Sequence, residues 1–191
     1  MTLALDRGNF VLFEAAHLPA IRPWFDDAET QRWLGGPDWP ETMLRAGAAF
    51  QPGEEFRGQI VVLQRSFVLL DSEGRPVALV TGDLYDRRTG YAGEGPGGPR
   101  FVDEPGPHRP TAGLAVVVDP ARRREGWGAR AVEAFIAHPD LAAAESFSAG
   151  IEPENTASRR LFERLGFILV SETPDWEDML EYEKTVASAD S

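Results

Sequence analysis

The sequence predicts an α/β fold in which strands and helices alternate. Two segments carry this prediction, because each reads as a strand followed by a turn and an amphipathic helix. They span residues 113–136 and 145–170. The third observation is size, since 191 residues with 42% hydrophobic content suffice for one domain with a buried core.

The first fifty residues predict one strand followed by short helices. Phe10–Phe13 reads as the strand, and His17–Phe25 and Ala28–Leu34 read as two short helices. Gly35–Pro40 has the composition of a loop, and Glu41–Phe50 follows as a third helix.

The middle of the chain predicts a hairpin and then a long loop. Arg65–Leu70 and Arg75–Asp86 read as strands around the turn Asp71–Gly74. Residues 87–112 are rich in glycine and proline, which break every pattern. Such a loop inside a compact domain is a functional lid or an insertion without a function, and both remain open.

The segment Gly113–Gly128 predicts a phosphate site. Leu114–Val118 is an apolar strand that Asp119 and Pro120 end, and the glycine-rich run Arg123–Gly128 opens a helix. Glycines allow close approach of a ligand to the backbone, and a helix N-terminus offers unpaired N–H donors and partial positive charge. The glycine spacing fits neither a Rossmann fingerprint nor a P-loop, so the alternative is a tight turn without a ligand.

The next segment favours the ligand. Glu145–Ile151 reads as a strand, Asn155 as the N-cap of a helix that Gly166 ends, and Phe167–Val170 as another strand. The order strand, R-x-x-G-x-G, helix, strand, N-x-x-S-x-x-L-F-x-x-x-G-F resembles the GNAT superfamily of acyl-CoA N-acyltransferases. The resemblance is specific over residues 113–167 and looser over residues 10–86, and it extends to the ribosomal-protein N-terminal and aminoglycoside 6′-N-acetyltransferase branches.

This resemblance implies a single domain with a central mixed, twisted sheet of about six to seven strands, splayed between the fourth and fifth strands, and with flanking helices. It also implies acetyl-CoA as the acyl donor. We expect no metal, because the chain has no cysteine and its histidines lack metal-ligand spacing. The pantetheine amides would pair with the backbone of Val116, Val117 and Val118. The pyrophosphate would lie over the N–H groups of Arg124, Glu125, Gly126, Trp127, Gly128 and Ala129. Arg122, Arg123 and Arg124 would add positive charge, and a solvated basic turn is the alternative for these three arginines.

In the second motif, the resemblance implies that Asn155 contacts the cofactor arm while it caps its helix. Phe162 stands where many relatives carry a tyrosine that protonates the departing thiolate, and phenylalanine has no proton to give. Phe162 would then only pack beside the cofactor. Ser158 is a candidate replacement donor, although a small packing residue is the alternative.

The reaction implied is direct attack of an amine on a thioester, which requires a base to remove a proton from the ammonium. Aminoglycoside 6′-acetyltransferases often carry an acid on the fourth strand, whereas Leu114–Val118 contains none. The candidate bases are therefore Asp83, on the third strand, and Glu152, at the end of the fifth. Both could equally be surface charges.

Asp38 and Trp39 are the candidate acceptor-binding residues, because an aromatic ring beside a carboxylate suits a cationic amine. Covering the hydrophobic core is the alternative for Trp39. His17, His108 and His138 lack metal-ligand spacing and receive no role.

Composition narrows the partners. A net charge of −12 disfavours nucleic acid and anionic membranes and suits a cationic acceptor, although ordinary solubility explains it equally. No cysteine is present, which excludes disulfides and thiol catalysis. No apolar run reaches membrane length and the first residues lack a signal-peptide pattern, so we expect a cytoplasmic monomer or homodimer.

The sequence thus predicts a single acyltransferase domain over residues 1–184, ending in an acidic edge hairpin near residues 172–183, and a disordered tail over residues 185–191. The predicted activity is N-acetylation of an amine on a small molecule or a protein N-terminus. Two alternatives remain open: transfer of another acyl group to a siderophore-type precursor, and a non-catalytic acyl-CoA-binding module.

Overall fold

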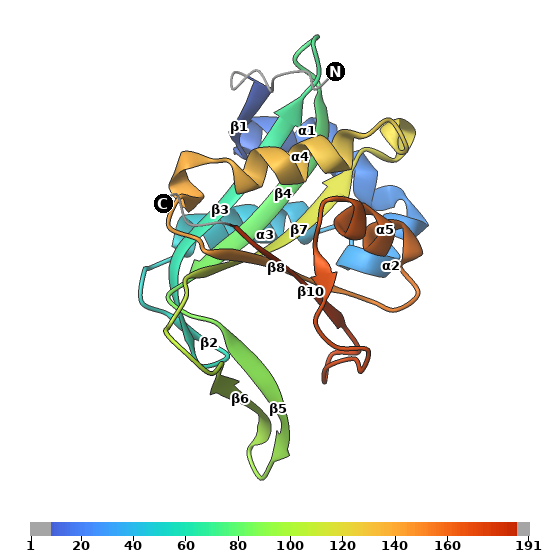
Figure 1. The fold of residues 1–191 in the computed structure, drawn as a ribbon. Coiled ribbons are helices and arrows are strands. Elements are labelled where there is room, and N and C mark those ends of the chain that lie inside the picture. Colours follow the sequence, from blue (N-terminus) through green and yellow to red (C-terminus); the bar gives the residue numbers. More distant parts are fainter. Residues whose placement is uncertain (1–8, 187–191) are drawn as a thin grey trace. The chain divides into compact units, whose positions relative to one another are not determined.

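The computed structural model of the protein describes residues 9–186. Its main sheet is built from the strands β1 (Phe10–Leu12), β2 (Glu55–Phe56), β3 (Gln59–Leu70), β4 (Pro76–Tyr85), β7 (Thr111–Val118), β8 (Ser146–Ile151), β9 (Ile168–Leu169) and β10 (Leu180–Thr185). The strand order is β1-β3-β4-β7-β8-β10-β9, with β2 paired to β3 (Figure 1). The sheet is mixed, because β7 and β8 are parallel while β8 and β10 are antiparallel.

The helices lie where the sequence predicts them, within a few residues. They are α1 (Leu18–Ile21), α2 (Ala28–Leu34), α3 (Trp39–Ala49), α4 (Trp127–Ile136) and α5 (Thr156–Arg164). Asp27 caps α2 by accepting from the backbone N–H of Thr30, and Gly166 follows α5 with a positive φ of 83°. Both are standard end signals that the sequence already displays.

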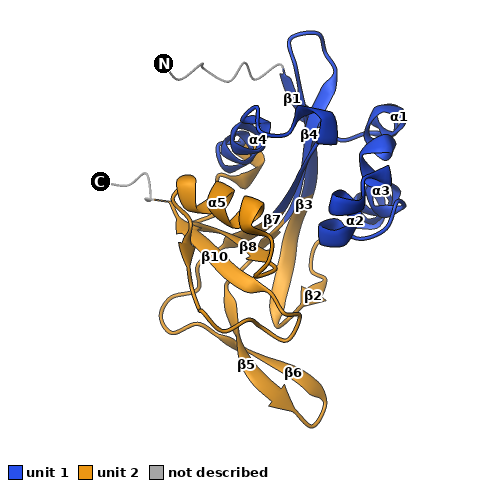
Figure 2. Cartoon of the chain, turned by 90° about the vertical axis from the view of Figure 1, so that its right-hand side faces the viewer, with its two compact units in different colours: residues 1–50, 65–82, 115–138 blue, residues 51–64, 83–114, 139–191 orange. Residues whose placement is uncertain are grey.

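By its contacts, the chain forms two compact units (Figure 2). The first unit holds residues 1–50, 65–82 and 115–138, and the second holds residues 51–64, 83–114 and 139–191. The divisions fall inside β3, β4 and β7, so these three strands contribute to both units.

In the first unit, helices cover both faces of the strands. Figure 2 shows α4 on one side of them and α1, α2 and α3 on the other. Buried side chains from both ends of this unit's sequence form one core, which includes Phe25, Val68, Leu79 and Val117. On the other side, the ring of Phe135 from α4 meets Phe67 edge-on, with centroids 6.1 Å apart.

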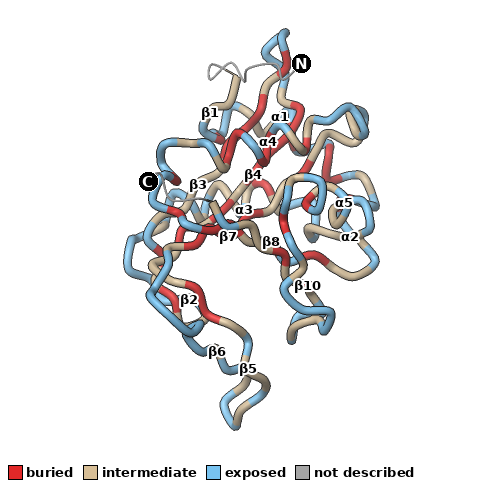
Figure 3. The backbone as a smooth tube through the Cα atoms, viewed as in Figure 1, coloured by how far each residue is buried: buried red, intermediate tan, exposed pale blue. Residues whose placement is uncertain are grey.

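In the second unit, α5 packs on the strands β8, β9 and β10. Tyr182 of β10 is fully buried, and its hydroxyl donates to Glu163 and accepts from Arg159, both on α5. Buried residues follow the strands, as Figure 3 shows, with Phe147 and Ile151 of β8 among them. These contacts fix the end of β8 and the start of α5 relative to each other.

The pairing of β7 with β8 is short. It runs only from Thr111↔Ser146 to Gly113↔Ser148, although β7 continues to Val118 and β8 to Ile151. Among the described residues the register of β7 with β8 ends at Gly113, and the predicted parting of the fourth and fifth strands beyond it stays a prediction.

The segment 87–112 differs from the predicted loop. Within it, β5 (Thr89–Gly95) and β6 (Gly98–Asp103) form an antiparallel hairpin, and β7 already begins at Thr111. Gly93 and Gly98 have positive φ values of 89° and 108°, so the glycines serve the bulge and the turn. Glycine content signals turns, but it does not exclude pairing across them.

At the C-terminus, Thr185 is the last residue of β10, although the sequence predicts it as the first residue of a tail. Residues 187–191 of that prediction lie outside the described residues. The acidic segment 172–183 does not form the predicted edge hairpin. Residues 172–179 connect β9 to β10, β10 lies between β8 and β9, and the edge strand is β9 at Ile168–Leu169, which has no acid.

Candidate active site

The N-terminus of α4 has the features of an anion site. Gly126 is its N-cap with φ 87°, a left-handed conformation that glycine adopts without steric cost. The helix has no side-chain cap hydrogen bond and no acid in its first turn. The first N–H groups of an α-helix have no partner within it, so those of Trp127, Gly128 and Ala129 remain for a ligand.

The two arginines before this loop are already paired with carboxylates. Arg123 contacts Asp27 at 2.6 Å and Glu29 at 2.7 Å, both at the start of α2. Arg122 contacts Asp71 at 3.2 Å and Glu125 at 2.8 Å. The sequence predicts both as added positive charge for a phosphate, but these pairs neutralise much of that charge.

Glu125 has a local partner set of its own. Its carboxylate accepts from Arg122 and, at 3.0 Å, from the indole N–H of Trp127. These bonds lower the pKa of Glu125, the Arg122 bond most strongly. Arg124 is exposed, with a positive φ of 66°, so the loop turns sharply there. The loop is thus fixed by its side chains, while its backbone N–H groups at the helix start remain for a ligand.

The valines of β7 behave as the sequence predicts for a backbone role. Val117 is buried in the core of the first unit, and Val116 and Val118 are partly buried. Their side chains therefore pack, and only their backbone could serve a ligand. The role of this backbone stays a prediction.

The residues of the second motif all lie in the second unit. The side-chain oxygen of Asn155 accepts from the backbone N–H of Ser158 at 3.1 Å, which confirms its capping. Phe162 is only 2% exposed and meets Phe167 edge-on, with ring centroids 4.9 Å apart. Glu152 follows the end of β8 and is partly exposed. Phe162 is therefore a core residue, and its contact with a cofactor stays a prediction.

Asp83 has the setting of a functional carboxylate. It lies on β4, and Tyr85, two residues along, donates its hydroxyl to Asp83 Oδ2 at 3.3 Å. Burial raises the pKa of Asp83 above its ordinary value, although hydrogen bonds from Gln64 and Tyr85 oppose the rise. Burial and the charge of Asp83 also raise the pKa of Tyr85. The carboxyl is thus shifted towards the range in which a base works at neutral pH.

Tyr85, the partner of Asp83, lies beside the last paired residues of β7 and β8. A Cβ on Gly113, the last paired residue of β7, would lie 3.5 Å from the Tyr85 ring and 3.9 Å from the Ser148 hydroxyl oxygen. A Cβ at these distances would be in ordinary van der Waals contact, so Gly113 places β7 directly against Tyr85 and Ser148.

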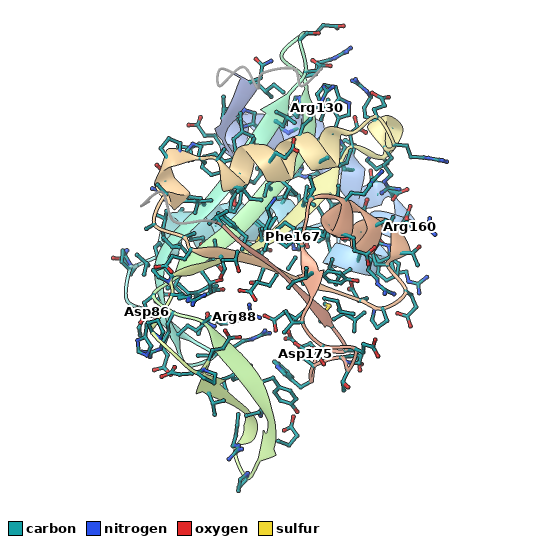
Figure 4. The ribbon with its side chains drawn as sticks, viewed as in Figure 1. Asp86, Arg88, Arg130, Arg160, Phe167 and Asp175 are labelled. Carbon is teal, nitrogen blue, oxygen red and sulfur yellow. The ribbon has the colours of Figure 1, made fainter. Side chains whose placement is uncertain are left out.

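A pocket of about 200 Å³ opens here, entirely within the second unit. Its wall includes Tyr85, Gly113 and Ser148 but not Asp83, which is joined to the wall through the Tyr85 hydroxyl. Figure 4 labels two of its charged residues, Arg88 and Asp175. No sequence pattern predicts this pocket, because its wall combines residues that are far apart in the sequence, from Phe56 of β2 to Glu181 of β10.

One side of the pocket is an aromatic cage around a cation. The Arg57 guanidinium lies over the rings of Phe56, Phe101 and Trp176, at 4.8, 5.6 and 5.4 Å from the centroids. It also pairs with the carboxylate of Glu177. Aromatic faces and a carboxylate thus bind the Arg57 guanidinium here, and these are the same kinds of contact that would bind the cation of a ligand.

The opposite side is acidic. Arg88 is 6% exposed and pairs with three carboxylates, those of Glu104, Glu181 and Glu183. One cation against three anions leaves a net negative cluster, and Glu181 also lines the pocket. Burial raises the pKa of Glu181, while the Arg88 charge opposes that rise.

Asp38 and Trp39 lie in the first unit, whereas this pocket belongs to the second. Trp39 stacks on Phe25, with centroids 5.4 Å apart, and belongs to the edge of the core. Packing therefore accounts for Trp39. Asp38 is exposed and makes no side-chain cap bond at the start of α3, so its predicted role in acceptor binding stays a prediction.

Comparison with known proteins now decides the family. The model of the acetyltransferase (GNAT) family matches residues 18–167, which is most of the chain and includes parts of both units. The chain belongs to the GNAT family. Comparison with curated protein sequences gives no match.

Solved structures agree with this fold. Aminoglycoside acetyltransferase AAC(6')-Ib, solved with coenzyme A, aligns with TM-score 0.63 and 16% identity over 93% of this chain and 94% of its own. An acetyltransferase from Thermus thermophilus aligns with TM-score 0.60 and 15% identity over 93% and 96%. A GCN5-related N-acetyltransferase from Kribbella flavida aligns with TM-score 0.58 and 18% identity over 93% and 96%. At these identities the likeness establishes the fold alone.

Membership in the GNAT family assigns acyl-CoA-dependent acetyl transfer to this chain in general terms. Residues 9–186 contain no helix long and apolar enough to cross a membrane. The same residues contain no cluster of three or more His, Asp or Glu side chains placed to hold a metal ion.

Tyr85, Ser148 and the acidic residues of the pocket were missed at the level of sequence. Tyr85 carried one available signal, its place two residues after Asp83 on a predicted strand, since such residues share a face. Arg57 and Glu177 carried none, because 120 residues separate them.

Proposed function

We propose that this GNAT protein transfers the acetyl group of acetyl-CoA to a primary amine, on a small molecule or a peptide end. The observation that carries the proposal is the start of α4, where Gly126 replaces a capping side chain and no acid lies in the first turn. An acid at that position would repel a pyrophosphate, whereas free N–H donors attract one.

The pocket of the second unit is the proposed acceptor site. Its wall combines aromatic rings, among them Phe56 and Tyr85, with the carboxylates of Asp175 and Glu181. It also contains two arginines, which are already paired with carboxylates: Arg57 with Glu177, and Arg88 with Glu181. Aromatic faces and carboxylates both favour a cation, and the net charge of −12 attracts amines over long range. The acceptor class that fits is a cationic amine with an apolar portion.

The chemistry needs little covalent help from the protein. An amine held in line with a thioester gains several kcal/mol from positioning alone. What the chain must add is removal of a proton, because an alkylammonium has a pKa near 10. Asp83 is the proposed base, and the β5–β6 hairpin, which supplies Tyr91 and Phe101 to the pocket, is the proposed lid.

The first test measures acetyl-CoA binding and thiol release side by side. The amine panel contains a polyamine, an aminoglycoside, phenethylamine and a basic peptide. The proposal expects amine-dependent thiol release together with an N-acetylated product. Acetyl-CoA binding without turnover on every amine would favour the non-catalytic module, which gains support from Phe162 and from the acid-free strand β7. Faster turnover with a longer acyl-CoA would favour the siderophore-type alternative.

A matched pair of variants tests the acceptor site. Glu181 and Glu104 contact Arg88 at 2.8 and 2.9 Å, but only Glu181 lines the pocket. We expect Glu181→Gln to raise the KM for a cationic amine roughly three- to tenfold, about 0.7–1.4 kcal/mol, with an unchanged Kd for acetyl-CoA. Glu104→Gln should change neither quantity. Equal effects of the two variants would remove the pocket from the proposal.

A further inference from the structure

Among the tyrosines of the described residues, Tyr85 alone joins the pocket to a partly buried carboxylate that lies outside the pocket wall. Its ring lines the pocket and its hydroxyl donates to Asp83 Oδ2 at 3.3 Å. Asp83 does not line the pocket, so a ligand there meets the phenol oxygen first. Tyr91 lines the same pocket but bonds to the exposed Glu94, and Tyr182 is buried between Arg159 and Glu163.

The orientation of this hydroxyl is fixed by its surroundings. Tyr85 and Asp83 are two residues apart on β4 and thus point to the same face. The Tyr85 ring stacks on Phe56, with centroids 6.0 Å apart and planes 18° apart, and a Cβ on Gly113 of β7 would lie 3.5 Å from the ring. Because its proton points to Asp83, the lone pairs of the phenol oxygen remain to accept from an ammonium N–H.

From this geometry we propose that Tyr85 relays the proton of the acceptor ammonium to Asp83, so that a carboxylate screened from the pocket acts as the base. The inference rests on the proposed function. The phenol oxygen takes a proton from the ammonium as its own proton passes to Asp83 Oδ2, and the phenol is neutral before and after the transfer.

The remaining steps balance without another acid. The freed nitrogen lone pair forms the C–N bond with the thioester carbonyl carbon, and the C–S bond breaks with its electron pair on sulfur. The thiolate takes the second nitrogen proton, and Asp83 later releases the first one to water. The net change is ammonium plus thioester to amide, thiol and one proton. This scheme needs no proton from position 162, where the chain has phenylalanine.

The surroundings suit such a relay. Burial raises the pKa of Asp83, which narrows its gap to the ammonium and eases the transfer. The same shielding and the charge of Asp83 raise the pKa of Tyr85, so the phenol is not a base by itself. The other charged groups of the pocket are Arg57, Arg88, Asp175 and Glu181, and their effects must be separated from that of Asp83.

The test compares Tyr85→Phe with Asp83→Asn, the double variant and Tyr91→Phe, using acetyl-CoA and the best amine of the panel. Each single relay variant should lower kcat at least tenfold, with Kd for acetyl-CoA within a few-fold of wild type. The double variant should lose no more than the worse single one, because both residues serve one step. Tyr91→Phe removes the other phenol of the pocket and should keep the wild-type shape of the pH profile.

Two readouts distinguish a relay from a structural role. The acid limb of the kcat–pH profile should be present in the wild type and absent in Asp83→Asn. Without any acetyl-CoA, the carboxyl 13C shift of Asp83 should titrate at higher pH in Tyr85→Phe, since that variant loses a hydrogen bond to the carboxylate. A kcat unchanged in folded Tyr85→Phe overturns the relay alone, as does an unmoved Asp83 titration. Absence of turnover by the wild type overturns the proposed function together with the relay.

Discussion

Replacing Gly126 tests the anion site, and the chain supplies a matched control in Gly74. Both glycines have left-handed φ values, 87° and 77°, and a Cβ added to either meets nothing within 4 Å. Both lie in the first unit. Gly126 begins α4, whereas Gly74 closes the turn between β3 and β4. The Cβ of a valine at either position therefore meets no neighbour, and the conformational cost is the shared effect of both substitutions.

The magnitudes follow from these values. A left-handed conformation costs an L-residue about 1–2 kcal/mol, and a β-branched one at least that much. For a chain of this length, each kcal/mol lowers Tm by about 2–4 °C, so both variants should lose about 2–8 °C. Only Gly126→Val adds side-chain atoms at the proposed phosphate site. It should weaken acetyl-CoA binding at least tenfold, about 1.4 kcal/mol, while Gly74→Val keeps the wild-type Kd.

Calorimetric titration with acetyl-CoA and thermal unfolding of the same samples separate the two effects. Equal Kd values for folded Gly126→Val and wild type would refute the assignment of the phosphate site. A loss of affinity in Gly74→Val as large as that in Gly126→Val would show that destabilisation, rather than the ligand contact, changes binding.

Three other predictions concern stability and the missing acid. Phe162→Tyr places a hydroxyl in a buried site against Phe167, so it should lower the free energy of unfolding by about 1–3 kcal/mol and leave the acetyl-CoA Kd within a few-fold of wild type. A hundredfold rise in turnover would instead show that the natural enzyme lacks a general acid that limits its rate. Arg88→Ala removes the buried cation from three carboxylates and should lower the free energy of unfolding, measured with denaturant, by about 3 kcal/mol. This is the lower end of the range for a broken buried ion pair, because the carboxylates are partly exposed. A decrease below about 1 kcal/mol would contradict this prediction. The pKa of Asp71 is lowered, chiefly by the hydrogen bond from the backbone N–H of Arg75, so the ionised carboxylate stabilises the fold above the unfolded pKa of 3.8, and this stabilisation is lost as pH falls through the folded pKa. The Tm difference between wild type and Asp71→Asn should therefore be largest at neutral pH and shrink below pH 3.8. A Tm difference that stays constant with pH would contradict this prediction.

Much of the fold could be predicted from the sequence because its signals are local. Asn155 caps its helix as predicted, and the helix predicted to open at the run Arg123–Gly128 begins at Trp127. Each signal depends only on residues within one turn. The turn Asp71–Gly74 is equally local, since Asp71 accepts from the backbone N–H groups of Glu73 and Arg75.

The candidate site was less predictable because its contacts are distant in sequence. Arg123 is predicted to serve a phosphate, yet it pairs with Asp27, 96 residues away. The pairing of β5 with β6 was missed because glycine-rich strands lack the alternating pattern that marks a strand. The surroundings of Tyr85 depend on Phe56 and Gly113, which only the sheet brings together.

The most direct test of the central claim is the time course of thiol release from acetyl-CoA, measured with and without each amine of the panel. The account predicts release that depends on the amine, with one N-acetylated product formed per thiol, as determined by mass spectrometry. Tight binding of acetyl-CoA with the same slow thiol release in the presence and absence of every amine would contradict it.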